Sequence, residues 1–188
     1  SPADLVSDLY AVTGDILHKK GEEQEAFAAY DSCLQWKDDN VMALNNYAYY
    51  LSEKGVDLHK AEAMSYKTIK AEPNNGTYLD TYAWILFMEE RYADAKTYID
   101  QALKNRDSTA DNSTVLEHAG DIYYMNGIAD ESVDFWKKAY TGENQTEVLA
   151  WKIKNRQYIT EEELKKRNAP KQKPAATKKS VRKGKKNK

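Results

Sequence analysis

The sequence repeats itself about every 34 residues, and this period limits the possible folds more than any other feature. A small residue recurs with separations of 34, 35 and 37, at Gly14, Ala48, Ala83 and Gly120. Such a period is typical of chains built from stacked units of two helices, because one unit alone cannot bury its apolar face. The chain is therefore expected to be all-α.

Other columns recur at fixed distances from the small residue. Three residues beyond it stand large side chains, at Leu17, Leu51, Leu86 and Tyr123. Seven residues beyond it, where a first helix is expected to end, stand Gly21, Gly55, Glu90 and Gly127. A second small residue follows after 12 or 13 positions, at Ala26, Ala61, Ala95 and Ser132. Small residues mark places where two helices cross closely, with large apolar neighbours filling the gaps.

These columns together resemble the tetratricopeptide-repeat family over residues 7 to 146. That family places a large residue, Leu, Gly or Ala, and Tyr in its first helix, then Ala, an aromatic residue and Ala in its second. The proline that the family often has near the end of a repeat is present only as Pro73. The resemblance implies a right-handed α-α superhelix (a solenoid) of about four helix-turn-helix repeats plus a C-terminal capping helix.

The expected domain organisation is a solenoid over residues 1-158, followed by a short helix and a disordered lysine-rich tail over residues 159-188. The repeats are placed at about 7-40, 41-75, 76-109 and 113-146, and the capping helix at 147-158. A capping box from Thr160 to Glu163 is expected to start the short helix. The first repeat has no cap of its own, which is consistent with a fragment of a longer repeat array.

One face of each first helix is expected to line a concave groove, where solenoids usually bind their partners. Reading that face through the four repeats gives an acidic surface with aromatic and methionine side chains, which predicts a protein or peptide partner with basic and apolar side chains. The candidate groove residues are Asp15, His18, Asn45, Tyr49, Asp80, Trp84, Phe87, Met88, Glu117, Asp121, Tyr124 and Met125.

Two observations qualify this interpretation. Trp84, Phe87 and Met88 could instead pack between adjacent helices, and the carboxylates could be ordinary solvated surface. Family members that grip the C-terminal carboxylate of heat-shock chaperones share a clamp of Lys, Asn, Asn, Lys and Arg. The comparable positions here hold Ala11, Asp15, Asn46, Thr77 and Thr81, so a chaperone-tail co-factor is not expected.

The net charge of −2 conceals an acidic body and a basic tail. From Lys165 to Lys188 there are twelve Lys and Arg and no acid, which leaves 16 bases against 30 acids in the first 164 residues, a net charge of −14. The candidate binding residues of the basic tail are Lys178, Lys179, Arg182, Lys183, Lys185 and Lys186. Opposite charges of this kind often mark an interaction tail.

Four interpretations of the tail stay open. It could bind nucleic acid without sequence preference, through phosphate contacts. Lys166-Arg167 and Lys178-Lys179 resemble a bipartite nuclear import signal. The tail could also lie along acidic surface of its own or another copy, giving self-association, or simply keep the chain soluble. The alternative to a groove-binding adaptor is therefore a nucleic-acid-associated or nuclear protein that works through this tail.

No residue pattern supports catalysis, a metal site or a cofactor. The histidines His18, His59 and His118 lie in separate repeats, and no two have the i, i+4 spacing of a helical metal pair. Cys33 stands in a close-packing column, where a buried thiol is structural. Phosphate-binding loops, nucleophile elbows and zinc-type cysteine clusters are all missing from the sequence.

The cellular compartment is expected from a second resemblance. No stretch approaches 18 consecutive apolar residues, so no membrane span is predicted. Residues 44-51, 78-84 and 117-123 resemble the C-terminal repeats of large bacterial tetratricopeptide proteins, many of them envelope lipoproteins and some of their relatives adaptors for processing proteases. The resemblance implies an adaptor in the bacterial cell envelope with a lipid anchor upstream; the cytoplasm stays open, and the nucleus is less favoured.

Overall fold

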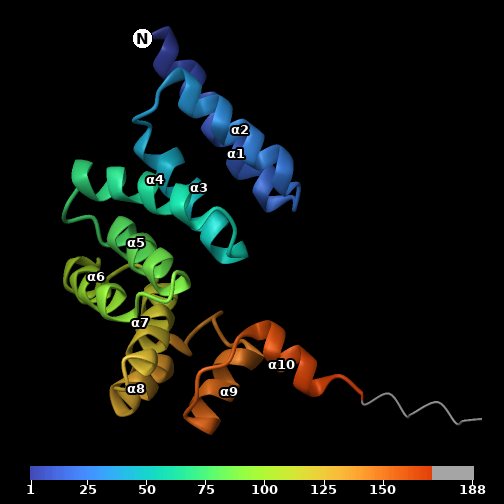
Figure 1. The fold of residues 1–188 in the computed structure, drawn as a ribbon, viewed down its shortest axis with the longest axis vertical. Helices are drawn as coiled ribbons and strands as arrows, with labels where there is room; N and C mark the ends of the chain where they lie inside the picture. Colours follow the sequence, from blue (N-terminus) through green and yellow to red (C-terminus); the bar gives the residue numbers. More distant parts are fainter. Residues whose placement is uncertain (171–188) are drawn as a thin grey trace, which may run out of the picture. The chain divides into compact units, whose positions relative to one another are not determined.

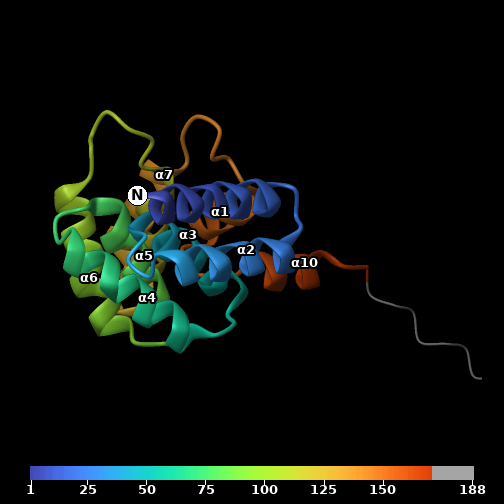
Figure 2. The same cartoon turned by 90° about the horizontal axis from the view of Figure 1, so that it is seen from above.

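The computed structural model describes residues 1–170, and every regular element in that range is a helix (Figures 1 and 2). Ten helices follow in chain order: α1 (Pro2–Lys19), α2 (Glu23–Trp36), α3 (Val41–Lys54), α4 (Leu58–Ala71), α5 (Gly76–Met88), α6 (Tyr92–Asn105), α7 (Ser113–Met125), α8 (Ala129–Ala139), α9 (Glu147–Asn155) and α10 (Glu161–Asn168). The predicted all-α class is confirmed. The chain divides into two compact units, Ser1–Tyr158 and a second that begins at Ile159.

In the first unit, consecutive helices pair into four hairpins. α1 packs on α2, α3 on α4, α5 on α6 and α7 on α8, and each hairpin also contacts the next one. Figure 1 shows the pairs following one another from blue to yellow. α9 contacts α8, and its Leu149 is fully buried in a cluster with Trp136. The four helix-turn-helix units and the C-terminal capping helix are therefore as predicted.

Side-chain caps fix where several helices begin. The side chains of Asn40, Asn75 and Thr146 accept hydrogen bonds from backbone N–H groups in the first turns of α3, α5 and α9. Each cap satisfies a donor that a helix start leaves unpaired. At the end of α3, Gly55 has a φ of 67°, a left-handed conformation that glycine adopts without a steric penalty. Glu90 takes the same role after α5 with a φ of 61°.

Glycine in the first helix lets a ring of the second helix lie directly on its backbone. A Cβ atom added at Gly14 would lie 2.7 Å from Tyr30, and one added at Gly120 would lie 2.3 Å from Trp136. Both rings are fully buried. In the second and third hairpins the same column holds alanine, and the position of the ring is taken by the smaller residues Ser65 and Ile99. The first and fourth hairpins thus pair glycine with a large aromatic ring.

The two rings also find a polar partner beside the glycine. The Tyr30 hydroxyl donates to Asp15 Oδ1 at 2.5 Å, and Trp136 Nε1 donates to Asp121 Oδ1 at 2.9 Å. In both cases the aspartate directly follows the glycine in the sequence. Buried Tyr and Trp rings usually need such an acceptor. In the second and third hairpins the equivalent position holds an aromatic residue, Tyr49 or Trp84.

α1 differs from the other first helices because its outer face is apolar and exposed. Leu5, Leu9, Val12 and Ile16 are all exposed and lie at helical spacing along one side. In α3, α5 and α7 the corresponding faces are covered by the preceding hairpin. Within residues 1–170, no helix is both long and apolar enough to cross a membrane.

The second unit is described by itself. α10 begins at a capping box in which the Thr160 hydroxyl accepts from the Glu163 N–H and the Glu163 carboxylate accepts from the Thr160 N–H. Ion pairs one turn apart, Glu161 with Lys165 and Glu162 with Lys166, follow along its exposed surface. Opposite charges at this spacing favour the helical conformation. The predicted tail residues Lys178, Lys179, Arg182, Lys183, Lys185 and Lys186 lie outside the described residues.

The contact between Gly120 and the Trp136 ring predicts the effect of adding one methyl group. Gly120→Ala should lower the free energy of unfolding by about 1–3 kcal/mol, because the new Cβ overlaps the ring and alanine's higher helix propensity cannot offset that strain. Urea denaturation followed by circular dichroism measures the change. The same substitution in a Trp136→Leu background should cost less, and an equal cost in both backgrounds would contradict this account of the packing.

Candidate functional site: a polar groove

A groove of about 620 Å³ lies in the first unit beside α3, α5 and the connection between α6 and α7. Its walls are mainly amide, hydroxyl and carboxylate side chains. The residues that line it are Asn45, Asn46, Tyr49, Asn74, Asn75, Gly76, Thr77, Asp80, Thr81, Asn105, Arg106, Asp107, Ala110, Asp111, Asn112, Thr114 and Val115. We call this surface the polar groove.

Asn45 gives the groove wall an unsatisfied hydrogen-bond acceptor. Its side chain is buried, and its Nδ2 donates to Asn46 Oδ1 at 3.4 Å. Its Oδ1 atom is buried with no hydrogen-bond partner among the described residues. A buried acceptor left unpaired costs about 1–3 kcal/mol, so a donor brought into the groove would gain more here than at an exposed amide.

A buried ion pair lies at the inner side of the groove. Asp80 Oδ1 is 2.8 Å from Nδ1 of His118, and both side chains are largely shielded from solvent. The His118 ring also stacks on Trp84, with ring centroids 4.1 Å apart. Burial opposes protonation of His118, but the charge and hydrogen bond of Asp80 outweigh it and raise the pKa of the imidazole. The pair therefore favours the charged histidine.

Comparison with known proteins shows which proteins this architecture resembles. No protein-family model matches the chain. A TPR repeat-containing protein of Pseudomonas aeruginosa is 35% identical over 66 residues, which are 35% of this chain and 11% of that protein. PilF of Pseudomonas aeruginosa has a similar structure, with a TM-score of 0.69 and 16% identity, covering 83% of this chain and 69% of PilF.

Two further solved structures share the fold. A tetratricopeptide repeat protein of Parabacteroides merdae matches with a TM-score of 0.62 and 20% identity, over 80% of this chain and 57% of that one. MamA of Desulfovibrio magneticus matches with a TM-score of 0.60 and 12% identity, over 81% of this chain and 78% of that one. The chain shares the helical-repeat fold of these proteins. It spans about a tenth of the length of its curated relative, and the likeness to solved structures concerns the helical-repeat superhelix.

Three of the predicted groove residues, Asn45, Tyr49 and Asp80, line the polar groove. The predicted acids Asp15, Glu117 and Asp121 do not line it. Each of the three has a partner within the first unit instead.

Asp15 accepts from Asn46 Nδ2 at 3.0 Å as well as from the Tyr30 hydroxyl. Lys152 of α9 is buried and lies 2.8 Å from Asp121 Oδ1 and 3.2 Å from Glu117 Oε1. Burial raises the pKa of Asp121, and the charge of Lys152 partly offsets that effect. These carboxylates already have internal partners, so a partner's cation would have to compete for them.

The remaining predicted groove residues are partly or fully buried against neighbouring rings and apolar side chains. Phe87 belongs to the apolar cluster around α5, α6 and α7, and Trp84, Met88 and Met125 pack against this cluster. Tyr124 lies beside the Trp136 ring, and the His18 ring stacks on Tyr50 at 3.4 Å between centroids. A role for these six side chains in partner binding stays a prediction.

Several groove residues were not predicted from the sequence. Asn46, Thr77 and Thr81 stand next to predicted positions in α3 and α5, and the wall from Asn105 to Asn112 belongs to a connection between helices. A signal for that wall existed, because the spacing from Ala83 to Gly120 is 37 residues instead of 34. The extra residues lie in this connection.

The polar groove contains no cysteine. The lone cysteine, Cys33, is buried elsewhere in the first unit, with its sulfur 3.2 Å from Ser7 Oγ. Burial raises the pKa of its thiol, which keeps it protonated and unreactive.

The His118–Asp80 pair predicts a pH-dependent contribution to stability. Because the folded state binds the imidazole proton more tightly than the unfolded chain, the contribution is complete below the ordinary pKa of 6.5 and is lost as the pH rises through the higher pKa of the folded state. Each pH unit between the two pKa values is worth about 1.4 kcal/mol. Urea unfolding of the wild type and His118→Gln should therefore differ more at about pH 6 than at about pH 9. An equal difference at both pH values would contradict the charged pair.

Proposed function

We propose that the chain is a non-catalytic protein-interaction module that binds an extended segment of a partner protein in the polar groove. Proteins with tetratricopeptide repeats generally act as scaffolds that hold other proteins, which supports the coarser part of this proposal. The observation that carries the finer part is the convergence of side-chain amides and hydroxyls on one groove, with the buried Asn45 Oδ1 left without a donor.

The groove chemistry suits a peptide backbone. An extended peptide offers alternating N–H donors and C=O acceptors, and amide side chains can pair with both. After a rotation of the Asn45 side chain toward the groove, its Oδ1 would accept a backbone N–H. The exposed Thr77 hydroxyl and the Asn74 amide can donate to a carbonyl. The Tyr49 ring, also at the groove, adds apolar contact area at little cost in side-chain entropy.

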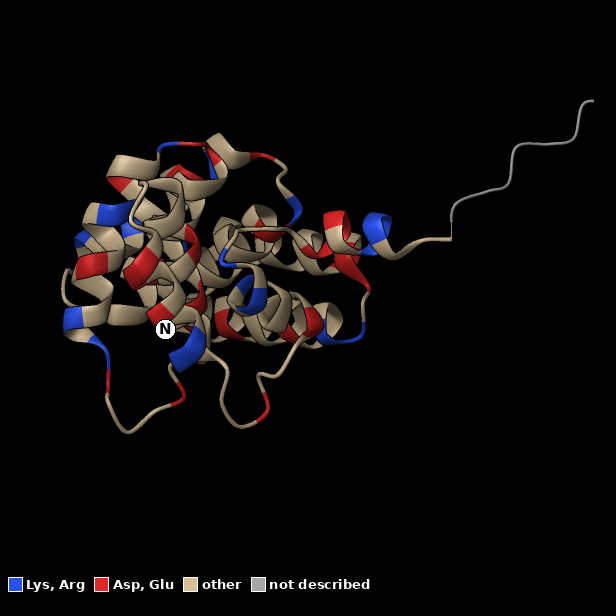
Figure 3. Ribbon diagram, turned by 90° about the horizontal axis from the view of Figure 1, so that it is seen from below, with Lys and Arg blue, Asp and Glu red and all other residues tan. Residues whose placement is uncertain are grey.

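The outer wall of the groove favours a basic partner. Asp107 and Asp111 stand there against a single Arg106. Hydrogen bonds from Thr109 lower the pKa of Asp107, and hydrogen bonds from Ser113 lower the pKa of Asp111, so both carboxylates are charged at neutral pH. In Figure 3 acidic residues recur on many of the described helices, which adds a long-range attraction for a cationic segment. We infer a partner segment that carries lysine or arginine beside apolar side chains.

A peptide screen tests the groove assignment. A displayed library of random peptides is selected against the full chain, and the enriched peptides are measured by fluorescence anisotropy. Asn45→Ala and Thr77→Lys should each weaken the selected peptides at least tenfold, the effect of losing about 1.4 kcal/mol, without lowering helicity. The matched control is Thr97→Lys, which changes an exposed threonine on α6 that does not line the groove.

The control and the groove variants together decide the result. Binding that is lost in Asn45→Ala and Thr77→Lys and kept in Thr97→Lys supports the proposal. A screen without binders, or peptides that bind all variants equally, would show that the polar groove is not the peptide site.

We further propose that the module works in the bacterial cell envelope and is tethered there by a lipid upstream. The proposal is supported by the resemblance of residues 44-51, 78-84 and 117-123 to bacterial envelope proteins and by the match to a bacterial protein over 66 residues. The product of the complete gene, tagged at its C-terminus, should sediment with membranes and be released by detergent. Recovery in the soluble cytoplasmic fraction would contradict the envelope assignment.

A further inference from the structure

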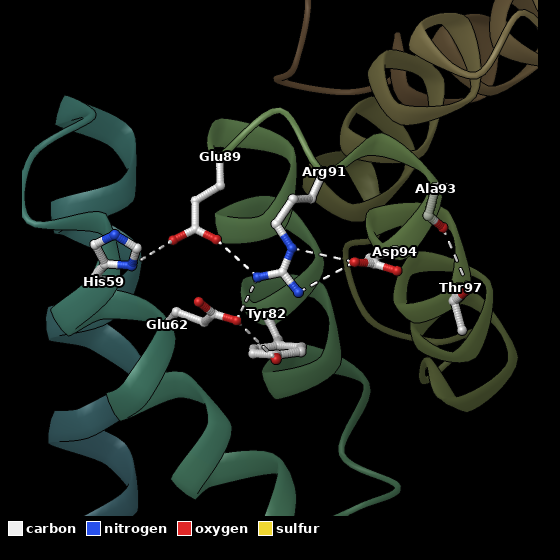
Figure 4. A network of polar contacts seen from close by, with 8 residues as sticks. All are labelled: His59, Glu62, Tyr82, Glu89, Arg91, Ala93, Asp94 and Thr97. Atoms are coloured by element: carbon white, nitrogen blue, oxygen red, sulfur yellow. Dashed lines mark hydrogen bonds and ion pairs between the residues drawn. The ribbon is translucent and has the colours of Figure 1, made fainter.

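A cluster of one imidazole and two carboxylates joins the second repeat to the third (Figure 4). His59 and Glu62 lie one turn apart on α4, and Glu89 follows the end of α5. The three side chains offer ligand atoms that all lie within 4.8 Å of one another, and His59 Nδ1 is 3.8 Å from Glu89 Oε1. Residues at i and i+3 share one helix face, so α4 presents both of its groups to Glu89.

Arg91 holds the carboxylates and leaves one oxygen of each available. Its Nη1 donates to Glu62 Oε1 at 2.8 Å and to Glu89 Oε2 at 3.2 Å, while Nε and Nη2 donate to Asp94. Glu89 Oε1 is buried and has no hydrogen-bond partner among the described residues, because His59 Nδ1, at 3.8 Å, lies beyond hydrogen-bonding distance. The Glu89 side chain as a whole is only 10% exposed. A carboxylate oxygen shielded in this way is expected to have a cation or donor beside it.

The charges of the cluster do not balance. Glu62, Glu89 and Asp94 bring three negative charges, and Arg91 brings one positive charge, so the cluster carries a net charge of −2 with His59 neutral. Solvated surface acids would explain an exposed excess of this kind, but they do not explain the buried oxygen of Glu89 that faces His59 in Figure 4. A divalent cation would neutralise the cluster and would also contact that oxygen.

We propose that His59, Glu62 and Glu89 form a binding site for zinc. One imidazole nitrogen and two carboxylate oxygens are a donor set that suits Zn²⁺, whereas Ca²⁺ needs six or more oxygens. Ligands about 2.0–2.1 Å from a tetrahedral zinc lie about 3.3 Å apart, so ligand atoms now within 4.8 Å of one another have to approach by up to about 1.5 Å. His59 is fully exposed and can make that movement by rotating its side chain.

The site leaves room for a fourth ligand and acts on the packing of two repeats. His59 and Glu62 also line a cavity of about 350 Å³ with Ala63, Tyr66 and Tyr82, from which water or a partner's side chain can reach the metal. A zinc ion held between α4 and the end of α5 would cross-link the second hairpin to the third. Because the folded state alone holds these ligands together, zinc should raise the unfolding temperature.

Calorimetry with zinc tests this site without any knowledge of the partner. The full chain, freed of metal with a chelator and dialysed, is titrated with ZnCl₂. We expect one ion per chain, an increase in unfolding temperature, and visible absorption bands of a low-symmetry site when Co²⁺ replaces zinc. His59→Ala and Glu89→Gln should each weaken zinc binding at least ~10-fold and abolish the cobalt bands.

Matched controls separate this cluster from other ligands. His18→Ala removes a histidine from the first repeat, and Glu25→Gln removes an exposed acid from α2; both should bind zinc as the wild type does. His59 is fully exposed, so His59→Ala is expected to fold, and circular dichroism checks this. Absence of stoichiometric zinc binding, or binding that survives His59→Ala and Glu89→Gln, would overturn the proposal.

Discussion

The close approach of the two helices in each hairpin is the constraint on which the rest of the first unit depends. At Gly14 and Gly120 there is no room for even a methyl group, because a tyrosine or tryptophan ring lies against the backbone. Where the column holds alanine, the facing residue is smaller, so all four hairpins keep buried contacts at this level with different pairs of side chains. The separation of the two helices within each hairpin, and with it the shape of the unit that is stacked, follows from this packing.

Polar contacts give the stack its second level of organisation. Asp80 and His118 join α5 to α7, and Arg91 joins α4 to the turn after α5, so both contacts run between neighbouring repeats and not within one hairpin. Apolar burial sets how strongly the repeats associate, whereas these directional contacts fix their relative position. The polar groove and the proposed zinc site both lie where such contacts leave one oxygen without a hydrogen-bond donor, at Asn45 and at Glu89.

The sequence predicts the hairpins well because the same packing recurs in every repeat. It predicts the groove only in part, because the groove is built from residues that do not recur from repeat to repeat. The recurrence of Gly14, Ala48, Ala83 and Gly120 fixes the helix pairs, since each position has the same role in every repeat. Helical periodicity places Asp80 and Asp121 on the same predicted face of their helices. It cannot show that Asp80 lines the groove whereas Asp121 pairs with Trp136 and Lys152, which lie 15 and 31 residues away. The wall built by the connection after α6 has no counterpart in the other repeats. The 37-residue spacing from Ala83 to Gly120 shows that residues are inserted there, but no repeat column shows that they line a groove.

The burial of Lys152 beside two carboxylates limits where the chain can be shortened. It is a buried cation contributed by α9, and both of its carboxylate partners belong to α7. A version that ends after the fourth hairpin would lose more than the cover of Leu149, because Asp121 would stay buried next to Glu117 without its counter-charge. Removing one partner of a buried pair is far more damaging than removing both. The minimal folding fragment of this chain should therefore extend past α9, and a designed truncation before it would need neutral residues at both acidic positions.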